Sequence, residues 1–213
     1  MLKGALLPFV FLSSHLSSLP HMFLILGLGN PGEKYQDTRH NVGFLFLDFL
    51  RQEWGFPVFE PSNRFESLLS RGKWSGHEVL LAKPETYMNL SGKPATALLH
   101  YYKITEKNLA VMHDDLDIAK GAIRTTESSS CAGHNGVADI IDRLGTKDFF
   151  RIRIGVGRPS GEPRLLADRS EEEMSPKDYV LLPFSYEEYQ ILHDDVFPEA
   201  KRALEEWLLK KDL

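Results

Sequence analysis

Short apolar runs that alternate with segments of helical periodicity are the feature that most restricts the fold of this chain. Residues 22–26 and 109–112 are apolar at every position, which is typical of strands buried on both faces of a sheet. Between them, the apolar residues of segment 41–54 recur at helical spacing, and Gly55 follows as a stop signal. Strands that alternate with helices predict an α/β domain with a mixed, mostly parallel sheet.

The remaining elements follow from turn residues and periodicity. Trp74, Ser75 and Gly76 separate two strand-like segments and predict a hairpin. We expect hairpin strands at 67–73 and 77–82, helices at 91–103 and 136–144, and further strands at 122–125 and 151–156. The C-terminal segment 185–211 is amphipathic, and we expect Pro198 to interrupt its helix.

Length and composition describe an ordinary globular protein. The 213 residues fit one domain with a full hydrophobic core. The single cysteine, Cys131, excludes an internal disulfide framework and fits a reducing compartment, so we expect the protein in the cytoplasm. The net charge of -5 argues against a generally basic surface for nucleic acid, but it is compatible with a local basic patch.

Residues 1–21 differ from the rest of the chain. One lysine precedes a short apolar run that Pro8 breaks, and a stretch rich in serine, leucine and histidine follows. The run is too short to span a bilayer, and a weak signal peptide is one interpretation. The interpretation we favour is an unstructured extension or a start assigned too early, with a single domain over residues 22–213. No other segment is apolar enough to predict a membrane span.

Polar side chains gather where predicted strands end and predicted helices begin. Asn30 and Asp114 follow strands, His40 lies at a helix start, and Asn89 and Asn135 precede helices. The carboxyl ends of strands in open α/β sheets form the ligand crevice, so these side chains can converge there. Asn and Asp also favour turns and caps for backbone reasons alone. Five such residues at successive element ends nevertheless favour a shared site.

Three other kinds of site fit the sequence less well. Residues 27–32 satisfy the glycine pattern of a dinucleotide site, but a loop follows where a helix should begin. No Gly-x-Ser-x-Gly segment marks a nucleophilic serine. Residues 113–117 carry an imidazole and three carboxylates, yet neighbours on a strand point to opposite faces and would not meet one ion. We therefore expect no metal and no cofactor, and instead a histidine and a carboxylate that activate water.

Six short motifs occur in order along the chain. They are Gly27-Leu-Gly-Asn-Pro-Gly32, Thr38-Arg-His-Asn-Val-Gly43, Lys83-Pro-Glu-Thr-Tyr-Met-Asn-Leu-Ser-Gly92, His113-Asp-Asp-Leu-Asp117, Gly133-His-Asn-Gly136 and Arg151-Ile-Arg-Ile-Gly-Val-Gly157. Together they resemble the bacterial peptidyl-tRNA hydrolase family, from about Met22 to the C-terminus. The resemblance implies a mixed sheet sandwiched by helices. It also implies an esterase that cleaves the bond between a nascent peptide and the ribose at the tRNA 3′ end, releasing tRNA for reuse.

The resemblance implies roles for individual residues. His40 matches the general base, Asp114 its partner, and Asn30 the residue that distinguishes a blocked peptidyl amide from a free aminoacyl amine. Substrate or tRNA contacts are implied for Tyr35, Tyr87, Met88, Asn89, Asn135 and Arg153. The tyrosines would stack on the unpaired tRNA end, and the arginine would meet a phosphate. The implied partner is peptidyl-tRNA, bound through its acceptor end and its peptide by a monomer that does not associate with membranes.

The residues implied in substrate or tRNA contacts could instead have ordinary structural roles. Met88 could fill the core, Arg153 could be a solvated outward side chain, and the two tyrosines could be half-buried aromatics. His113 and His134 are expected to be structural. The alternative function is a non-catalytic RNA-binding protein of the same fold, although pure binding has no need of a base with an orienting carboxylate.

Two positions depart from the family pattern. The loop before Gly133 reads Ser128-Ser-Ser-Cys-Ala132 where the family is usually glycine-rich, so we expect a stiffer or differently shaped loop. A basic residue often lies near Thr126, and the nearest one here is Arg124. Other basic residues are therefore expected to supply phosphate contacts, namely Lys120, Lys147 or Arg158.

Overall fold

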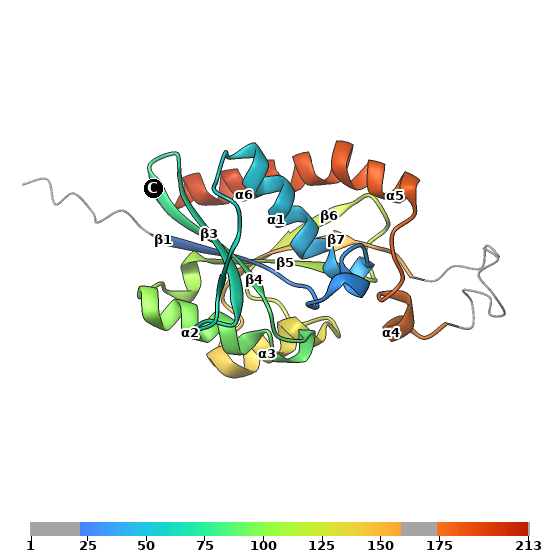
Figure 1. Ribbon diagram of the computed structural model, residues 1–213, viewed down its shortest axis with the longest axis horizontal. Coiled ribbons are helices and arrows are strands. Elements are labelled where there is room, and N and C mark those ends of the chain that lie inside the picture. The colour runs from blue at the N-terminus through green and yellow to red at the C-terminus, as the bar shows by residue number, and fades with distance from the viewer. Residues whose placement is uncertain (1–21, 159–173, 213) are drawn as a thin grey trace, which may run out of the picture.

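One seven-stranded sheet runs through the middle of the computed structural model, which describes residues 22–158 and 174–212 (Figure 1). The strands are β1 Met22–Gly27, β2 Glu60–Ser62, β3 Ser67–Trp74, β4 His77–Pro84, β5 Leu109–Asp115, β6 Ile123–Thr126 and β7 Phe150–Gly155. Their order is β2-β3-β4-β1-β5-β7-β6. The central strands β4, β1, β5 and β7 are parallel, and antiparallel pairs flank them, which confirms the predicted mixed sheet.

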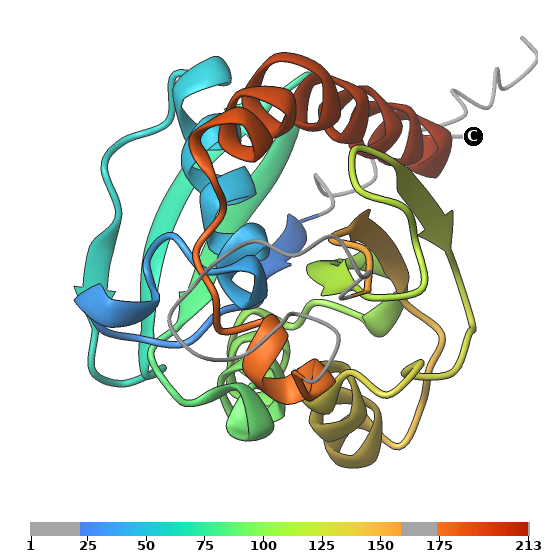
Figure 2. The same cartoon turned by 90° about the vertical axis from the view of Figure 1, so that its right-hand side faces the viewer.

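Helices cover both faces of the sheet. They are α1 Val42–Glu53, α2 Gly92–Tyr102, α3 Asn135–Leu144, α4 Pro176–Tyr179, α5 Tyr186–Ile191 and α6 Phe197–Leu209. In Figure 1, α1 and α6 lie above the sheet, and α2 and α3 lie below it. The parallel strands end on the right of that view, and Figure 2 looks onto this edge. Among the described residues, no helix is both long and apolar enough to cross a membrane. The expectations for residues 1–21 lie outside the described residues.

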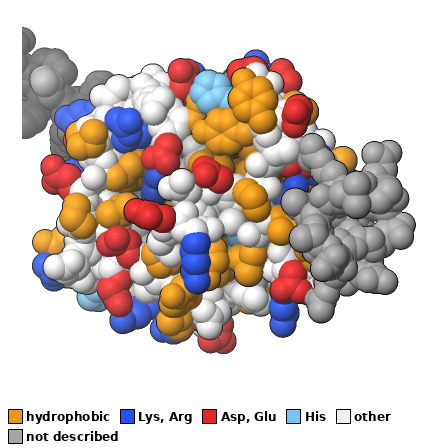
Figure 3. Space-filling view, turned by 45° about the vertical axis from the view of Figure 1, so that its right-hand side comes forward, with side chains coloured by type: hydrophobic (Ala, Val, Ile, Leu, Met, Phe, Trp, Pro, Cys, Tyr) orange, Lys and Arg blue, Asp and Glu red, His pale blue; other side chains and the backbone are white. Residues whose placement is uncertain are grey.

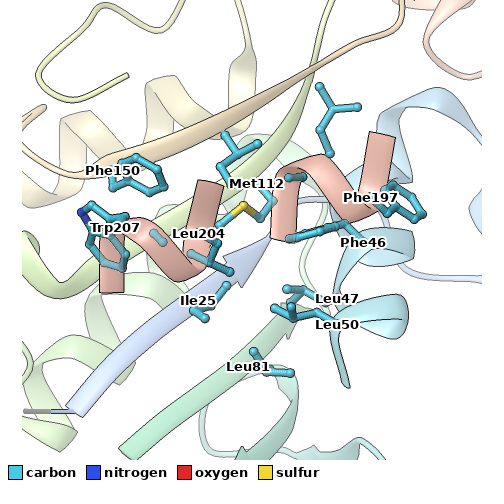
Figure 4. Close-up of a cluster of buried hydrophobic side chains, with 14 of the residues drawn as sticks. Ile25, Phe46, Leu47, Leu50, Leu81, Met112, Phe150, Phe197, Leu204 and Trp207 are labelled. Carbon is cyan, nitrogen blue, oxygen red and sulfur yellow. The ribbon is translucent and has the colours of Figure 1, made fainter. Parts of the chain in front are cut away.

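Each face of the sheet has its own hydrophobic core. On the upper face, Phe46 and Leu50 of α1 and Leu204 and Trp207 of α6 pack against β1, β4, β5 and β7 (Figure 4). On the lower face, side chains of α2 and α3 pack against the opposite sides of β1, β4 and β5. Every residue of β5 is buried. The uninterrupted apolar run at residues 109–112 predicted this burial for the first four of them.

The predicted hairpin is confirmed, with a two-residue turn between Trp74 and His77. Ser75 and Gly76 both have positive φ, at 48° and 89°, as the twist of a tight hairpin requires. Two of the strands and α-helices given above were not predicted. They are α4 and the edge strand β2, in which Pro61 is tolerated because an edge strand has one unpaired side.

The prediction that Pro198 interrupts the C-terminal helix is wrong. Helical structure continues from Tyr186 to Leu209, and a π-helical segment, Leu192–Val196, joins α5 to α6. Pro198 lies in the first turn of α6, where its missing N–H is easily tolerated. The wider π turn just before it absorbs the change in hydrogen-bond pattern that proline imposes.

The strand that was predicted to end before His113 extends through Asp115. Residues 113–115 pair in parallel with residues 153–155 of β7, so the polar triplet is the end of a central strand rather than a loop. Asp114 is therefore held by backbone hydrogen bonds at the carboxyl edge of the sheet.

Gly43, in the first turn of α1, lets this helix approach the sheet directly. A Cβ atom there would lie closer than van der Waals contact to the backbone of Leu28 and to the carbonyl oxygen of Met112. Gly27 and Gly43 likewise meet backbone to backbone. The 3-10 turn Arg39–Asn41, which leads into α1, is thereby placed against the end of β5.

We predict that Gly43→Ala lowers the free energy of unfolding by about 1–3 kcal/mol, because the added methyl group meets rigid backbone. Urea unfolding followed by circular dichroism measures the change. Gln52→Ala, on the exposed side of the same helix, is the matched control and should stay within about 0.5 kcal/mol of the parent protein. Equal stability of the two variants would contradict the close packing.

Candidate active site

A cavity of about 450 Å³ opens at the carboxyl ends of the parallel strands. It is lined by Asn30, His40, Met88, Asp114, Asp115, Leu116, Asp117, Ala132, Gly133, His134, Asn135, Arg158, Pro176, Lys177, Val180 and Leu181. These residues come from segments that are far apart in sequence and that meet at the sheet edge seen in Figure 2. The lining combines an apolar wall with a few polar groups, which is typical of a ligand site.

The imidazole of His40 is paired with the carboxylate of Asp114 in this cavity. The distance from His40 Nδ1 to Asp114 Oδ1 is 2.8 Å, so Nδ1–H donates and Nε2 is the nitrogen that can accept a proton. Burial lowers the pKa of His40, but the charge and hydrogen bond of Asp114 outweigh burial and raise that pKa above its ordinary value. Burial raises the pKa of Asp114, but two histidines, His40 and His134, more than offset it, so that the carboxylate stays ionised.

Three hydrogen bonds fix the orientation of Asn30. Its backbone N–H donates to Asn41 Oδ1 at 2.8 Å, and its carbonyl accepts from Asn41 Nδ2 at 3.0 Å. Its side-chain Oδ1 accepts from the backbone N–H of Met88 at 2.9 Å. Because a backbone N–H can only donate, the amide oxygen of Asn30 must face Met88, and Nδ2 is the end that a ligand can meet.

His134 also contacts the carboxylate of Asp114. Its Nε2 lies 3.0 Å from Asp114 Oδ1, and its Nδ1 accepts from the backbone N–H of Val137 at 3.3 Å, which caps α3. His113 packs edge-on against this ring and donates from Nδ1 to the carbonyl of Asp114. Burial holds the pKa of His113 well below its ordinary value, so this imidazole is neutral.

A segment from the C-terminal half holds the backbone around His40. The N–H of His40 donates to the carbonyl of Val180 at 2.8 Å, and the N–H of Arg39 donates to that of Leu182 at 3.1 Å. The guanidinium of Arg39 also bonds the carbonyls of Leu182 and Pro183 and forms an ion pair with Glu188 at 2.9 Å. The backbone of His40 is therefore held by residues about 140 positions away.

The structure brings most of the predicted site residues together. Asn30, His40, Met88, Asp114 and Asn135 all line the cavity. Four other predicted residues are described but are not part of this lining: Tyr35, Tyr87, Asn89 and Arg153. Tyr87 is 57% exposed, and Asn89 is also exposed beside Met88. Arg153 lies behind the cavity wall, where its Nε and Nη2 bond Asp115 Oδ2 at 2.7 and 2.6 Å.

Sequence reasoning missed three contributors. Asn41 and Arg39 flank His40 in the Thr38–Gly43 motif. Their position beside His40 could have indicated that both contribute to the site. His134, which we expected to be structural, contacts the carboxylate of Asp114 directly. The glycine pattern at 27–32 leads into a short 3-10 turn, Glu33–Tyr35, and α1 begins only at Val42, which is not the geometry of a dinucleotide site.

The described residues contain one group whose ligand atoms lie near enough to suggest a metal. It consists of His40, Asp114 and His134, with these atoms within 4.8 Å of one another. Both imidazole nitrogens lie at hydrogen-bond distance from the same carboxylate oxygen, 2.8 and 3.0 Å, and point at that oxygen rather than at a shared empty position. The donor set therefore fits a hydrogen-bonded triad better than a metal centre, whose bonds would be about 2.0–2.2 Å long.

The loop at 128–133, which departs from the family pattern, forms part of the cavity wall. Arg151, only 1% exposed, donates to the carbonyls of Ser129 and Ser130 and so ties this loop to β7. Ala132 has a φ of 47° and Ser128 one of 56°, a region that glycine occupies without strain. The positive φ values place both residues in the left-handed region, and the expectation of a stiffer or differently shaped loop stays a prediction.

We predict that Ala132→Gly raises the free energy of unfolding by about 1 kcal/mol, because glycine relieves the left-handed conformation. Thermal and urea unfolding measure the change. Ala138→Gly is the matched control, since this residue lies inside α3, where glycine should destabilise by about 1 kcal/mol. A loss of stability in both variants would show that Ala132 is not strained.

The fold and this cavity define an α/β enzyme with a histidine–carboxylate pair at the carboxyl edge of its sheet. The sequence profile of the family described as peptidyl-tRNA hydrolase matches residues 24–213. The chain therefore belongs to the peptidyl-tRNA hydrolase family, and it hydrolyses peptidyl-tRNA. The six motifs recognised in the sequence pointed to the same family.

Individual relatives agree with this assignment. The chain is 44% identical to peptidyl-tRNA hydrolase of Brevibacillus brevis over 182 residues, which cover 85% of this chain and 82% of the relative. It is 43% identical to the enzyme of Bacillus subtilis, with 84% and 89% of the two chains covered. The crystal structure of peptidyl-tRNA hydrolase from Acinetobacter baumannii superposes with a TM-score of 0.75 at 31% identity, covering 91% of this chain and 94% of that one.

Proposed function

We propose that His40 is the general base of the hydrolysis and that Asp114 is its partner. His40 Nε2 takes a proton from water as the water oxygen bonds to the ester carbonyl carbon of peptidyl-tRNA. The bond from that carbon to the ribose oxygen then breaks, and the imidazolium returns the proton to the ribose oxygen. The products are a free peptide carboxyl group and a tRNA with a free terminal hydroxyl.

The single observation that carries this proposal is the 2.8 Å contact between His40 Nδ1 and Asp114 Oδ1 inside the cavity. It fixes the tautomer that leaves Nε2 free, and it stabilises the imidazolium that forms during the attack. Such a base needs neither a metal nor a covalent intermediate.

Asn30 is proposed to act on the substrate as a hydrogen-bond donor. Its oxygen is occupied by the N–H of Met88, so only Nδ2 is available to the cavity. A fixed N–H donor suits a carbonyl oxygen, whose negative charge grows during the attack. A blocked peptidyl group offers a further amide carbonyl to such a donor, whereas a free aminoacyl group carries an ammonium that an N–H donor repels.

The tRNA is proposed to contact residues around the cavity rather than a broad basic surface. Acidic and basic side chains are interspersed on the face shown in Figure 3, in line with the net charge of -5. Arg153 and Arg158 lie at or behind the cavity wall, ion-paired with Asp115 and Asp117. Few phosphate contacts imply a shallow dependence of binding on salt.

The remaining predicted contacts stay proposals. Tyr87, largely exposed, offers a face on which the unpaired end of the tRNA can stack, and Tyr35 is partly exposed. Asn135 lines the cavity, Asn89 is exposed beside Met88, and Met88 itself forms part of the cavity wall, on the side proposed for the peptide. We further propose that the enzyme works as a monomer in the cytoplasm, a reducing compartment that suits its single cysteine, Cys131.

We predict that His40→Ala lowers kcat/KM on N-acetylaminoacyl-tRNA by about 10²–10⁴-fold, the usual contribution of a general base. Release of the labelled amino acid from tRNA measures the rate. His100→Ala, an exposed histidine at the end of α2, is the control and should retain full activity. Undiminished hydrolysis without His40 would rule out the proposed base.

We predict that Asn30→Asp lowers kcat by about 10²–10³-fold, because a carboxylate cannot donate to the developing negative charge. One carboxylate oxygen can still accept from the N–H of Met88, so the fold should be kept. The preference for N-acetylaminoacyl-tRNA over aminoacyl-tRNA should also fall, because the new charge attracts ammonium. Asn63→Asp, at an exposed turn, is the control, and equal rates for both variants would contradict the donor role.

A further inference from the structure

Two imidazole rings share one carboxylate oxygen in the cavity. Asp114 Oδ1 lies 2.8 Å from His40 Nδ1 and 3.0 Å from His134 Nε2. The three side chains come from different parts of the fold: the turn before α1, the end of β5 and the residue that caps α3. Asp114 and His134 are almost fully buried, so water can replace neither hydrogen bond without cost.

The hydrogen bonds of His134 define its tautomer. Its Nδ1 accepts from the N–H of Val137, so Nδ1 carries no proton and Nε2–H must be the donor to Asp114. His134 is therefore a neutral, oriented donor whose direction is set by the first turn of α3. A carboxylate oxygen that receives two N–H donors gives less of its charge to each one.

We propose that His134 is a positioning residue that sets the basicity of His40 by taking up part of the hydrogen-bonding capacity of Asp114. It also stops the carboxylate from rotating away from the base. The expected effect of His134 on the rate rests on the proposed role of His40 as the base. The expected effect of His134 on the protonation of His40 does not depend on that role.

The other charged groups near His40 are largely neutralised by partners of their own. They are Asp115 with Arg153, Asp117 with Arg158, and Arg39 with Glu188. Lys177 lines the cavity but is exposed, so solvent screens its charge. His113 packs against His134 and is neutral because burial depresses its pKa. The carboxylate of Asp114 is thus the main charge that His40 faces, and His134 is its competitor for that carboxylate.

The direction of the effect follows from the sign of the interaction. The Asp114 carboxylate favours the protonated form of His40 and raises the pKa of this base. Without the second donor, the carboxylate interacts more strongly with His40, and protonation persists to higher pH. Because the base must be neutral to accept a proton, the acid limb of the pH–rate profile should move to higher pH.

The test compares His134→Leu with His134→Gln. Leucine removes the N–H donor, whereas the amide nitrogen of glutamine can occupy the position of Nε2 and still donate. Both substitutions remove the acceptor that caps α3, so both should lower the melting temperature similarly. The pair therefore separates the donor to Asp114 from the structural role of the ring.

Two readouts are measured on the whole chain, namely the titration of His40 by imidazole ¹H–¹⁵N NMR and the pH profile of kcat/KM on N-acetylaminoacyl-tRNA. We expect His134→Leu to raise both midpoints by about half a pH unit to one pH unit, and His134→Gln to leave both near those of the parent protein. Unchanged midpoints in His134→Leu, or equal shifts in the two variants, would overturn the proposal. A shifted NMR titration with an unshifted rate profile would instead refute His40 as the base and leave the effect of His134 on His40 standing.

Discussion

The close approach of α1 to the sheet is the constraint on which the site depends. Gly27 and Gly43 bring backbone against backbone at the end of β1, where side chains would keep helix and sheet apart. This contact brings the turn that carries His40 within hydrogen-bond reach of Asp114 on β5. The position of His40 thus depends in part on two residues that have no side chain.

Local patterns were enough to predict most of the architecture. The apolar runs of β1 and β5, the helical spacing in α1 and the turn at Ser75 and Gly76 depend on neighbouring residues, which a sequence displays directly. Predictions about strand length were less accurate, because Asp114 remains in a strand only through pairing with β7. The prediction for Pro198 was wrong for a similar reason. A π turn accommodates this proline, and no simple sequence pattern predicts such a turn.

The residues of the candidate site could be predicted where they stand in recognisable motifs. Contacts between segments that are far apart in sequence could not be predicted. His40, Asp114 and Asn30 stand in recognisable motifs, and the structure places all three around one cavity. The direction in which Asn30 presents its amide depends on Met88, 58 positions further along the chain. The contact of His134 with Asp114 likewise requires α3 to begin beside the end of β5, which is a property of the assembled sheet.

The hydrogen bonds that residues 39 and 40 form with residues 180–183 join parts of the chain that are made at different times. The segment that supports the backbone of His40 is synthesised about 140 residues after His40 itself. Residues 39 and 40 therefore lack these backbone partners until the segment 180–183 has been made. The proposed base thus gains this backbone support only after most of the chain has been synthesised.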